Sequence, residues 1–369
     1  MEATRRTPLY EEHLKLHGHM APFFGWEMPL WYTSAREEHL AVRSSVGLFD
    51  VCHMGQILVE GPKAIAAVDR LVTGNVAGLT DGTALYCPML HPSGGIVDDL
   101  IVYRVNGEKI FICVNAATSE KDFNHMVKSD NTGTKFTNLS DRYGQIAVQG
   151  PRAKDLMQRY LPKVADALPE LFRFTEWTAP EGHYLVSTTG YTGEFGYEIY
   201  CPLSVTASIW RRLFELGGDL GLIAAGLSSR DTLRLESKLC LYGQDIDDKT
   251  NPVEAGLNWT IHWDKEFIGR DAIVAIDRKN PPKKLVGFEM VDGGIPRHEC
   301  EIFVGDQRVG VVTSGNRCPK VDKVVGLAYL DSPYYKRGTK VEIDIRGKRK
   351  AAQVVKTPFY RRGGEEAGE

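Results

Sequence analysis

Hydrophobic and polar positions follow two different periods along the chain. Up to about residue 275, runs with helical spacing alternate with apolar runs typical of strands. Val205, Ile209, Leu213 and Leu216 share one helical face, and Gly217-Gly218 marks the end of that helix. Beyond Lys284 the period changes to two, which predicts six short strands: Leu285–Met290, Glu301–Val304, Arg308–Thr313, Val324–Leu330, Val341–Ile345 and Ala351–Val355. Six strands without a helix predict a small barrel or sandwich.

Helix starts are visible in the first part of the chain. Ser34 and Glu37 form a capping box, in which each side chain satisfies the other's free backbone donor, and the helix is expected to end at Gly47. A second helix is expected to begin at Pro62, because the first helical position does not need an N–H. A further helix is expected from about Ser229 to Lys238.

A short repeat links two of these regions. Val59–Ala64 reads Val-Glu-Gly-Pro-Lys-Ala, and Val148–Ala153 reads Val-Gln-Gly-Pro-Arg-Ala. Each follows an apolar strand-like stretch and opens a helix. The repeat predicts a duplicated α+β core, while two independent helices that begin with proline remain the alternative.

A proline-rich charged segment divides the chain. Residues 277–284 contain two adjacent prolines among charges, which is typical of a linker. We therefore expect a region of two α+β lobes at residues 1–276, a linker at 277–284, a β-barrel at 285–362 and a disordered tail at 363–369.

Composition and charge exclude several classes of protein. Of the 369 residues, 43% are hydrophobic and 25% charged, which is typical of globular domains and not of disordered chains. A net charge of −3 predicts no nucleic-acid partner, and no apolar run reaches the roughly 18 residues of a membrane span. The seven cysteines are far apart and form no Cys-x-x-Cys, which favours a reducing cytoplasm. His17, His19 and His53 lack a third ligand at metal spacing, so no metal is expected.

Polar residues that interrupt apolar strands are candidates for chemistry. Asp98 and Asp99 precede an apolar strand, and adjacent strand residues point to opposite faces, so one carboxylate can enter a pocket. The alternative is a turn that Asp98 caps. Glu198 has apolar or aromatic neighbours on both sides, and a carboxylate there is costly unless paired. It could bind the N–H edge of a pterin or guanine, or lie in water on an edge strand.

Arginine and glycine positions add to this pattern. Arg230 lies near a helix N-terminus, where its charge opposes the helix dipole, as an arginine placed for a carboxylate or ligand would. A structural network of Arg230, Arg234 and Glu236 is the alternative. Gly190, Gly193 and Gly196 do not form a dinucleotide-binding motif and are expected to bring the backbone close to another group.

Motifs over nearly the whole chain occur in one characteristic order: Arg6–Tyr10, Gly25–Leu30, His53–Gly55, Gly94–Leu100, Val114–Ala116, Thr189–Glu194, Arg230–Glu236, Tyr242–Asp245 and Lys356–Arg361. In these motifs the chain resembles the T-proteins of the glycine cleavage system, which are tetrahydrofolate-dependent aminomethyltransferases. The resemblance implies an α+β, three-lobed fold around a central folate channel. It also implies transfer of a methylene from the aminomethyl-lipoyl arm of H-protein to tetrahydrofolate, with release of ammonia and without a metal.

The resemblance also implies roles for individual residues. The second aspartate of the pair, Asp99, matches the family's catalytic carboxylate. The folate pocket would be formed by residues that match the family's motifs: Met54, Tyr86, Asn115, Tyr191, Glu198, Arg230 and Arg361.

The chain departs from the family pattern at several positions. Ser228-Ser229 stands where the family usually has Gly-Ala, and Phe195 stands where it has an aspartate. Cys318-Pro319-Lys320 replaces a Ser-Pro-Thr turn, and Cys52 replaces a serine. These changes leave two alternatives open. One is a tetrahydrofolate-dependent demethylase on the same fold. The other is a non-catalytic folate-binding protein of iron–sulfur assembly, since Lys238-x-Cys240-x-x-Gly243-Gln244 aligns with the cysteine motif of that group.

Overall fold

The computed structural model describes residues 4–363, which form two compact units. The first unit comprises Met1–Cys87 and Leu100–Arg230, and the second comprises Pro88–Asp99 and Asp231–Glu369. Of the tail expected at residues 363–369, only Gly363 lies within the described part. Among the described residues, no helix is both long and apolar enough to cross a membrane.

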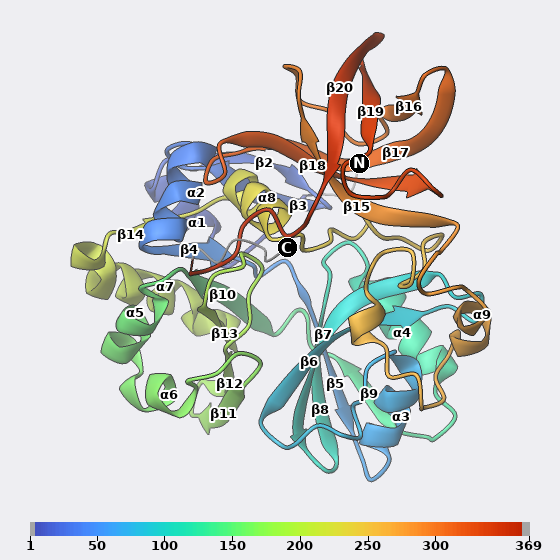
Figure 1. Ribbon diagram of the computed structural model, residues 1–369. Helices are drawn as coiled ribbons and strands as arrows, with labels where there is room; N and C mark the ends of the chain where they lie inside the picture. The colour runs from blue at the N-terminus through green and yellow to red at the C-terminus, as the bar shows by residue number, and fades with distance from the viewer. Residues whose placement is uncertain (1–3, 364–369) are drawn as a thin grey trace. The chain divides into compact units, whose positions relative to one another are not determined.

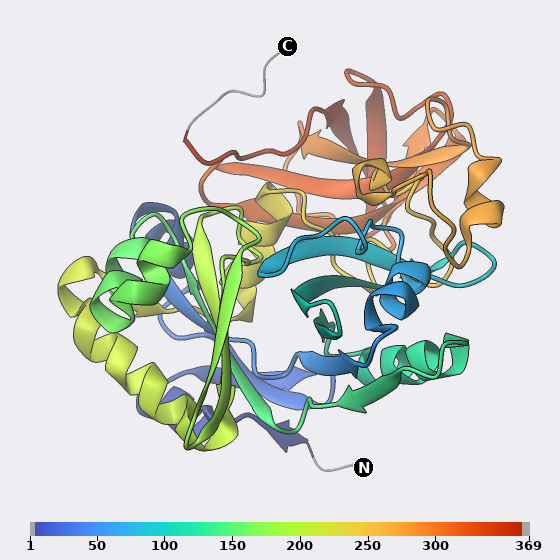
Figure 2. The same ribbon diagram turned by 90° about the horizontal axis from the view of Figure 1, so that it is seen from below.

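A six-stranded sheet forms one half of the first unit. Its strand order is β11-β12-β13-β10-β4-β14. The strands are β4 (Val46–Asp50), β10 (Tyr143–Gln149), β11 (Phe174–Ala179), β12 (Gly182–Ser187), β13 (Gly196–Pro202) and β14 (Leu222–Ala224). Helices α5 (Ala153–Tyr160), α6 (Pro162–Ala167) and α7 (Leu203–Gly217) lie on one side of this sheet (Figures 1 and 2), with the short η1 (Gly218–Leu220) after α7. The apolar residues of α5 and α7 pack on the strands, so the core lies between helices and sheet.

A five-stranded sheet of order β6-β7-β8-β5-β9 forms the other half. Its strands are β5 (Gly55–Glu60), β6 (Thr83–Leu90), β7 (Ile96–Asn106), β8 (Lys109–Val114) and β9 (Lys135–Asn138). Helices α3 (Ala64–Leu71) and α4 (Ser119–Ser129) pack against β5. The turn that joins β6 to β7 belongs to the second unit.

The N-terminal segment adds a small sheet of order β1-β3-β2 and two helices. These elements are β1 (Arg5–Arg6), α1 (Tyr10–Lys15), β2 (His19–Phe23), β3 (Trp26–Trp31) and α2 (Ala35–Ser44). The predicted capping box is confirmed in part: Ser34 Oγ accepts a hydrogen bond from the Glu37 amide at 3.1 Å, which caps α2. The helix ends at Ser44 rather than at Gly47, since Val46 already belongs to β4.

The sequence repeat corresponds to two units of the same design. Both β5–α3 and β10–α5 are a strand, a Gly-Pro turn and a helix. Gly61 and Gly150 adopt φ of 127° and 132°, and a Cβ on Gly150 would lie 2.4 Å from the Ser45 carbonyl oxygen, so only glycine fits there. The expectation that Pro62 opens its helix is wrong, because α3 begins at Ala64, whose amide donates to the Gly61 carbonyl in a turn.

The second unit contains the predicted barrel. The strands β15 (Lys283–Met290), β16 (Glu301–Val304), β17 (Gln307–Cys318), β18 (Lys323–Asp331), β19 (Lys340–Ile345) and β20 (Lys348–Val355) close in the order β15-β18-β17-β16-β19-β20 (Figure 1). Alternating side chains such as Phe288, Val312 and Ile343 fill the interior. The α+β class and the six-stranded barrel are therefore confirmed. The predicted helix near Ser229 is α8 (Leu227–Glu236), and η2 (Asn258–Thr260) and α9 (Arg270–Val274) precede the barrel.

A buried polar triad joins the N-terminal segment to the six-stranded sheet. His13 and Asp50 are fully enclosed, and His13 Nε2 lies 2.8 Å from Asp50 Oδ2, while Tyr32 OH lies 2.8 Å from His13 Nδ1. Burial alone would raise the pKa of Asp50, but His13, Thr7 and Cys52 hydrogen-bond to the carboxylate and lower that pKa to about 2. The triad therefore holds an ionised carboxylate inside the core.

This arrangement predicts an acid-dependent contribution to stability. The pKa of Asp50 is near 2 when folded and about 3.9 when unfolded, so its contribution is present above about pH 4 and is lost as the pH falls toward 2. Asp50→Asn is expected to lower the free energy of unfolding by about 3 kcal/mol at neutral pH and to remove this acid-dependent part. Urea unfolding at several pH values measures both.

Asp166→Asn is the matched control for this experiment, because Asp166 is exposed in the same unit. It should unfold within about 0.5 kcal/mol of the wild type. If Asp50→Asn and the wild type lost stability in parallel on acidification, the carboxylate would have no such role.

Candidate active site

Six of the eight candidate residues lie in the first unit and two in the second. The first unit holds Met54, Tyr86, Asn115, Tyr191, Glu198 and Arg230; the second holds Asp99 and Arg361.

Glu198 occupies the middle of β13, between two neighbouring strands. It pairs with Ala147 of β10 and with Ser187 of β12, and its side chain is almost fully buried. Thr189 Oγ1 donates a hydrogen bond to Oε2, and Gln145 Nε2 donates to Oε1 at 3.1 Å. The edge-strand alternative is wrong, because β13 is an inner strand and the carboxylate is held by donors instead of water. With one donor on each oxygen, each oxygen keeps a lone pair that could accept a further hydrogen bond.

Gln145 connects this carboxylate to a wider buried network. Its Nε2 also donates to Tyr200 OH at 3.1 Å, and its Oε1 accepts from Gln56 Nε2 at 3.1 Å. The hydroxyl of Tyr103 lies 3.0 Å from that of Tyr200 and 3.2 Å from Thr189 Oγ1. Burial raises the pKa of both phenols, so they remain protonated donors around the single carboxylate.

The backbone at two glycines of residues 190–196 packs tightly against the buried side-chain amide of Gln149. A Cβ on Gly190 would lie 2.1 Å from Gln149 Oε1, and one on Gly196 would lie 2.3 Å from Gln149 Nε2. The Gln149 amide donates to the Thr189 carbonyl at 3.1 Å and accepts from Thr192 Oγ1 at 2.8 Å. The expected close backbone approach is thus confirmed, and Gln149 is the group that the glycines approach. It fixes the loop that carries Thr189 and Tyr191.

Arg230 lies in the first turn of α8 and faces an aromatic ring. Its guanidinium carbon lies 4.6 Å from the centroid of the Tyr191 ring, a distance typical of a cation–π contact. Burial lowers the pKa of Arg230, and the negative charge of Glu198 partly opposes this effect. Glu198, Tyr191 and Arg230 are therefore neighbours in the first unit.

Met54 borders the same network. Its carbonyl accepts from Gln56 Nε2 at 3.0 Å, and its side chain packs on the cluster that contains Tyr103 and Tyr200. The preceding residue, His53, is buried, and burial lowers the pKa of its imidazole to about 4. The Asp50 carboxylate opposes this decrease in pKa, whereas the Arg230 guanidinium adds to it. The His53 imidazole is therefore neutral at physiological pH.

Tyr86 and Asn115 are the other two candidates of the first unit. Tyr86 lies on β6, and Asn115 directly follows β8. Both are half-buried. They belong to the five-stranded sheet, and Glu198 belongs to the six-stranded one.

In the second unit, the two adjacent aspartates differ in exposure as strand alternation requires. Asp98 is fully buried, whereas Asp99 is half-buried on β7. The pKa of the Cys240 thiol is raised mainly by burial, and the negative charges of Asp245 and Asp99 raise it further. Asp99 is therefore the more exposed member of the pair. Arg361 is exposed and follows the last barrel strand.

The arginine network proposed as an alternative is only partly present. Within the second unit, Arg234 binds Asp245 at 2.5 Å and Asp231 at 2.8 Å. Glu236 accepts hydrogen bonds from the amides of Lys320 and Val321. These residues thus have structural partners of their own, and the partner of Arg230 is the Tyr191 ring.

Gln145, which donates to Glu198, is a residue of the candidate site that the sequence motifs did not indicate. It lies 53 positions before Glu198 in the chain, and strand pairing alone brings the two together. Its signal was a polar residue inside the apolar strand Tyr143–Gln149, the same kind of signal that identified Glu198.

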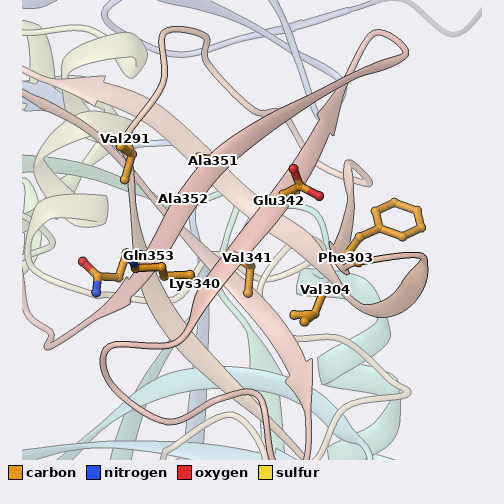
Figure 3. A pocket seen from close by; sticks show the side chains of 10 residues that line it. Val291, Phe303, Val304, Lys340, Val341, Glu342, Ala351, Ala352 and Gln353 are labelled. Carbon is orange, nitrogen blue, oxygen red and sulfur yellow. The ribbon is translucent and has the colours of Figure 1, made fainter.

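A pocket of about 340 Å³ lies on the barrel, and none of the eight candidates is among the residues that line it (Figure 3). It is lined by Val291, Phe303, Val304, Gly305, Lys340, Val341, Glu342, Ala351, Ala352 and Gln353. In the described part of the chain, no group of three or more His, Cys, Asp or Glu side chains could hold a metal ion.

Two protein families match consecutive parts of the chain. Residues 9–265 match the family described as GCVT N-terminal domain, and residues 283–361 match the glycine cleavage T-protein C-terminal barrel domain. The second match covers the observed barrel strands.

Curated proteins and a solved structure are similar over almost the full length. An aminomethyltransferase of Halothermothrix orenii is 45% identical over 96% of this chain and 99% of its own. One from Bdellovibrio bacteriovorus is 45% identical with the same coverage. The crystal structure of the glycine cleavage system aminomethyltransferase T from Bartonella henselae has a TM-score of 0.88 at 32% identity, covering 97% of this chain and 98% of that one.

The Glu198 network predicts the effect of removing one donor. Thr189→Val keeps the side-chain volume but leaves a buried carboxylate oxygen without its hydroxyl donor. We expect the free energy of unfolding to fall by about 1–3 kcal/mol, measured by urea titration. Thr178→Val, at an exposed position of β11, is the control and should change stability by less than about 0.5 kcal/mol. Equal stability of the two variants would show that Thr189 does not support Glu198.

Proposed function

Because the chain belongs to the glycine cleavage T-protein family and is an aminomethyltransferase, we propose that it transfers the methylene of the H-protein aminomethyl-dihydrolipoyl arm to tetrahydrofolate. The products are 5,10-methylenetetrahydrofolate, ammonia and the dihydrolipoyl arm. The seven cysteines are all without disulfides, which supports a cytoplasmic location.

The observation that carries the proposal is the setting of Glu198. A buried carboxylate with one free acceptor site on each oxygen suits the paired N–H groups of a pterin edge. Tyr191 and Arg230 beside it provide an aromatic face and a cation, which suit a flat ring and a folate carboxylate. Tyr86, Met54 and Asn115 would add packing and one polar contact in the same pocket.

The reaction balances without an added oxidant or metal. Two nitrogen atoms of tetrahydrofolate form bonds to the methylene carbon, while its bonds to the amino nitrogen and to sulfur break. The two protons that the folate nitrogens lose go to ammonia and to the dihydrolipoyl thiol. Positive charge develops at the carbon when either bond breaks, so the transition state is cationic.

Asp99 would stabilise this cation. It is the accessible carboxylate of the pair, and a fixed negative charge near a developing cation lowers the barrier because the group needs no reorganisation. Proton transfer to the leaving amine is the other role that a carboxylate at this position could have. Arg361, which is exposed, would bind a folate carboxylate or guide the incoming arm.

Asp99→Asn is expected to retain tetrahydrofolate affinity and to lose turnover by about two to three orders of magnitude, the usual effect of removing one electrostatic stabiliser. Release of ammonia and methylenetetrahydrofolate from aminomethyl-loaded H-protein measures turnover, and calorimetry measures binding. Asp264→Asn, an exposed position, is the control. Near-normal turnover of Asp99→Asn would exclude the catalytic role.

Glu198→Ala is expected to weaken tetrahydrofolate binding by about 1–3 kcal/mol, because the buried pterin N–H groups would lose their acceptor. Calorimetric titration of the folded variant gives this value, with circular dichroism as the check of folding. Glu301→Ala, an exposed residue of the barrel, serves as the control. Unchanged affinity in Glu198→Ala would remove this residue from the proposed pocket.

A further inference from the structure

Gln145 is a buried amide on an inner strand of the six-stranded sheet. It is the third residue of β10, it pairs with Tyr200 of β13, and it is almost fully enclosed. A buried primary amide needs partners for its oxygen and for both of its N–H groups. The structure provides all of these partners from three other strands, β5, β8 and β13.

The oxygen of this amide is occupied by donors from β5 and β8. Gln56 Nε2 donates to Gln145 Oε1 at 3.1 Å, and Cys113 Sγ donates to the same oxygen at 3.7 Å. Gln56 Nε2 also donates to the Met54 carbonyl at 3.0 Å, so both of its hydrogens are used and the orientation of its amide is fixed. Because Oε1 of Gln145 faces these donors, its NH2 group faces away from them.

The NH2 group of Gln145 has one acceptor for each of its hydrogens. Nε2 donates to Glu198 Oε1 and to the Tyr200 hydroxyl, both at 3.1 Å. A reversed amide would place Oε1 against the carboxylate, and two acceptors with no hydrogen between them repel each other. The surroundings therefore permit one orientation of the Gln145 amide, in which it donates to Glu198.

The backbone of Gln145 is held as firmly as its side chain. Its N–H donates to Cys52 Sγ at 3.2 Å, and Cys52 Sγ donates to its carbonyl at 3.3 Å. The same carbonyl accepts a hydrogen bond from the Val51 amide at 3.1 Å. The position of Nε2 is therefore fixed by the chain, and so is the direction from which it binds the Glu198 carboxylate.

We propose that Gln145 is a positioning residue for tetrahydrofolate, which acts through Glu198 by orienting its carboxylate toward the N–H groups of the pterin. The proposal rests on the proposed function of Glu198. Gln145 binds Oε1 and Thr189 binds Oε2, so the carboxylate cannot rotate without losing a donor. The remaining lone pairs then have fixed directions, and a ligand with two adjacent N–H groups binds without reorganisation of the carboxylate.

Gln145→Met tests the contact, because methionine has a similar length and no charge but no N–H group. We expect the KM for tetrahydrofolate to rise about tenfold, the loss expected for one hydrogen bond to a charged group, and the KM for aminomethyl-loaded H-protein to stay unchanged. A smaller folded fraction would instead lower the apparent kcat and change neither KM. Gln158→Met, at an exposed position of α5, is the matched control and should behave as the wild type. A wild-type KM for tetrahydrofolate in Gln145→Met would overturn the proposal.

A double variant shows whether Gln145 acts through Glu198. In a Glu198→Ala background there is no carboxylate to orient, so adding Gln145→Met should change tetrahydrofolate affinity by less than about twofold in calorimetric titration. A further loss of about tenfold in the double variant would assign Gln145 a role independent of Glu198 and would also overturn the proposal.

Gln145→Glu tests the direction of the hydrogen bond and decides the matter if Gln145→Met does not fold. Glutamate has the same shape as glutamine, but it places a second carboxylate against Glu198, and two such groups come together only when they share a proton. We expect tetrahydrofolate binding by this variant to be lost near about pH 8 and to recover toward about pH 5, relative to the wild type titrated in parallel. Binding equal to that of the wild type at both pH values would contradict the assigned direction.

The other titratable groups around Gln145 do not change charge over this range. Burial raises the pKa of the phenols of Tyr103 and Tyr200 and of the thiols of Cys52 and Cys113, so all four stay protonated. Arg230, whose charge acts on Glu198, remains a cation. A pH-dependent difference between Gln145→Glu and the wild type would therefore come from the new carboxylate.

The same titrations separate this proposal from the proposed function. If the wild type bound no tetrahydrofolate, the proposed function and the role of Gln145 would both be rejected. If the wild type bound tetrahydrofolate and transferred the methylene, while Gln145→Met kept full affinity, only the role of Gln145 would be rejected.

Discussion

A carboxylate inside a β-sheet is the constraint on which the first unit depends. Glu198 lies on an inner strand and is almost fully buried, so the cost of removing its carboxylate from bulk water must be offset by donors. Those donors come from two directions: Gln145 from the paired strand and Thr189 from the loop before β13. Gly190 and Gly196 let the backbone of this loop pack directly against the Gln149 side chain, where a Cβ would not fit. The glycine motif and the buried charge are therefore parts of one arrangement.

The network explains why the surrounding groups are phenols, hydroxyls and amides. A second carboxylate would repel Glu198, and a lysine or arginine in direct contact would occupy the acceptor sites that a ligand needs. Tyr103 and Tyr200 remain protonated because burial raises their pKa. The carboxylate is thus held by neutral donors, with Arg230 near it on the side of Tyr191. Such a site is suited to a ligand that presents N–H groups.

The sequence was sufficient to find Glu198, since a charged residue in an apolar strand is visible in the chain itself. It could not reveal Gln145 as its partner, because their contact depends on the pairing of β10 with β13. The barrel strands were predictable because each alternates with period two and ends at a turn. The start of α3 was not, because the turn after Gly61 delays the helix by two residues and depends on local hydrogen bonding. Local patterns thus predicted elements, while partners required the fold.

Two departures from the family pattern, at Phe195 and at Cys318, are accommodated by local contacts. Phe195 packs edge-on against Tyr197 at 5.3 Å between ring centroids and joins the apolar core of its unit, so an apolar side chain is stable there. Cys318 is buried and its thiol donates to the Thr232 carbonyl, while the amides of Lys320 and Val321 are held by Glu236. Each of these changes has a local structural partner.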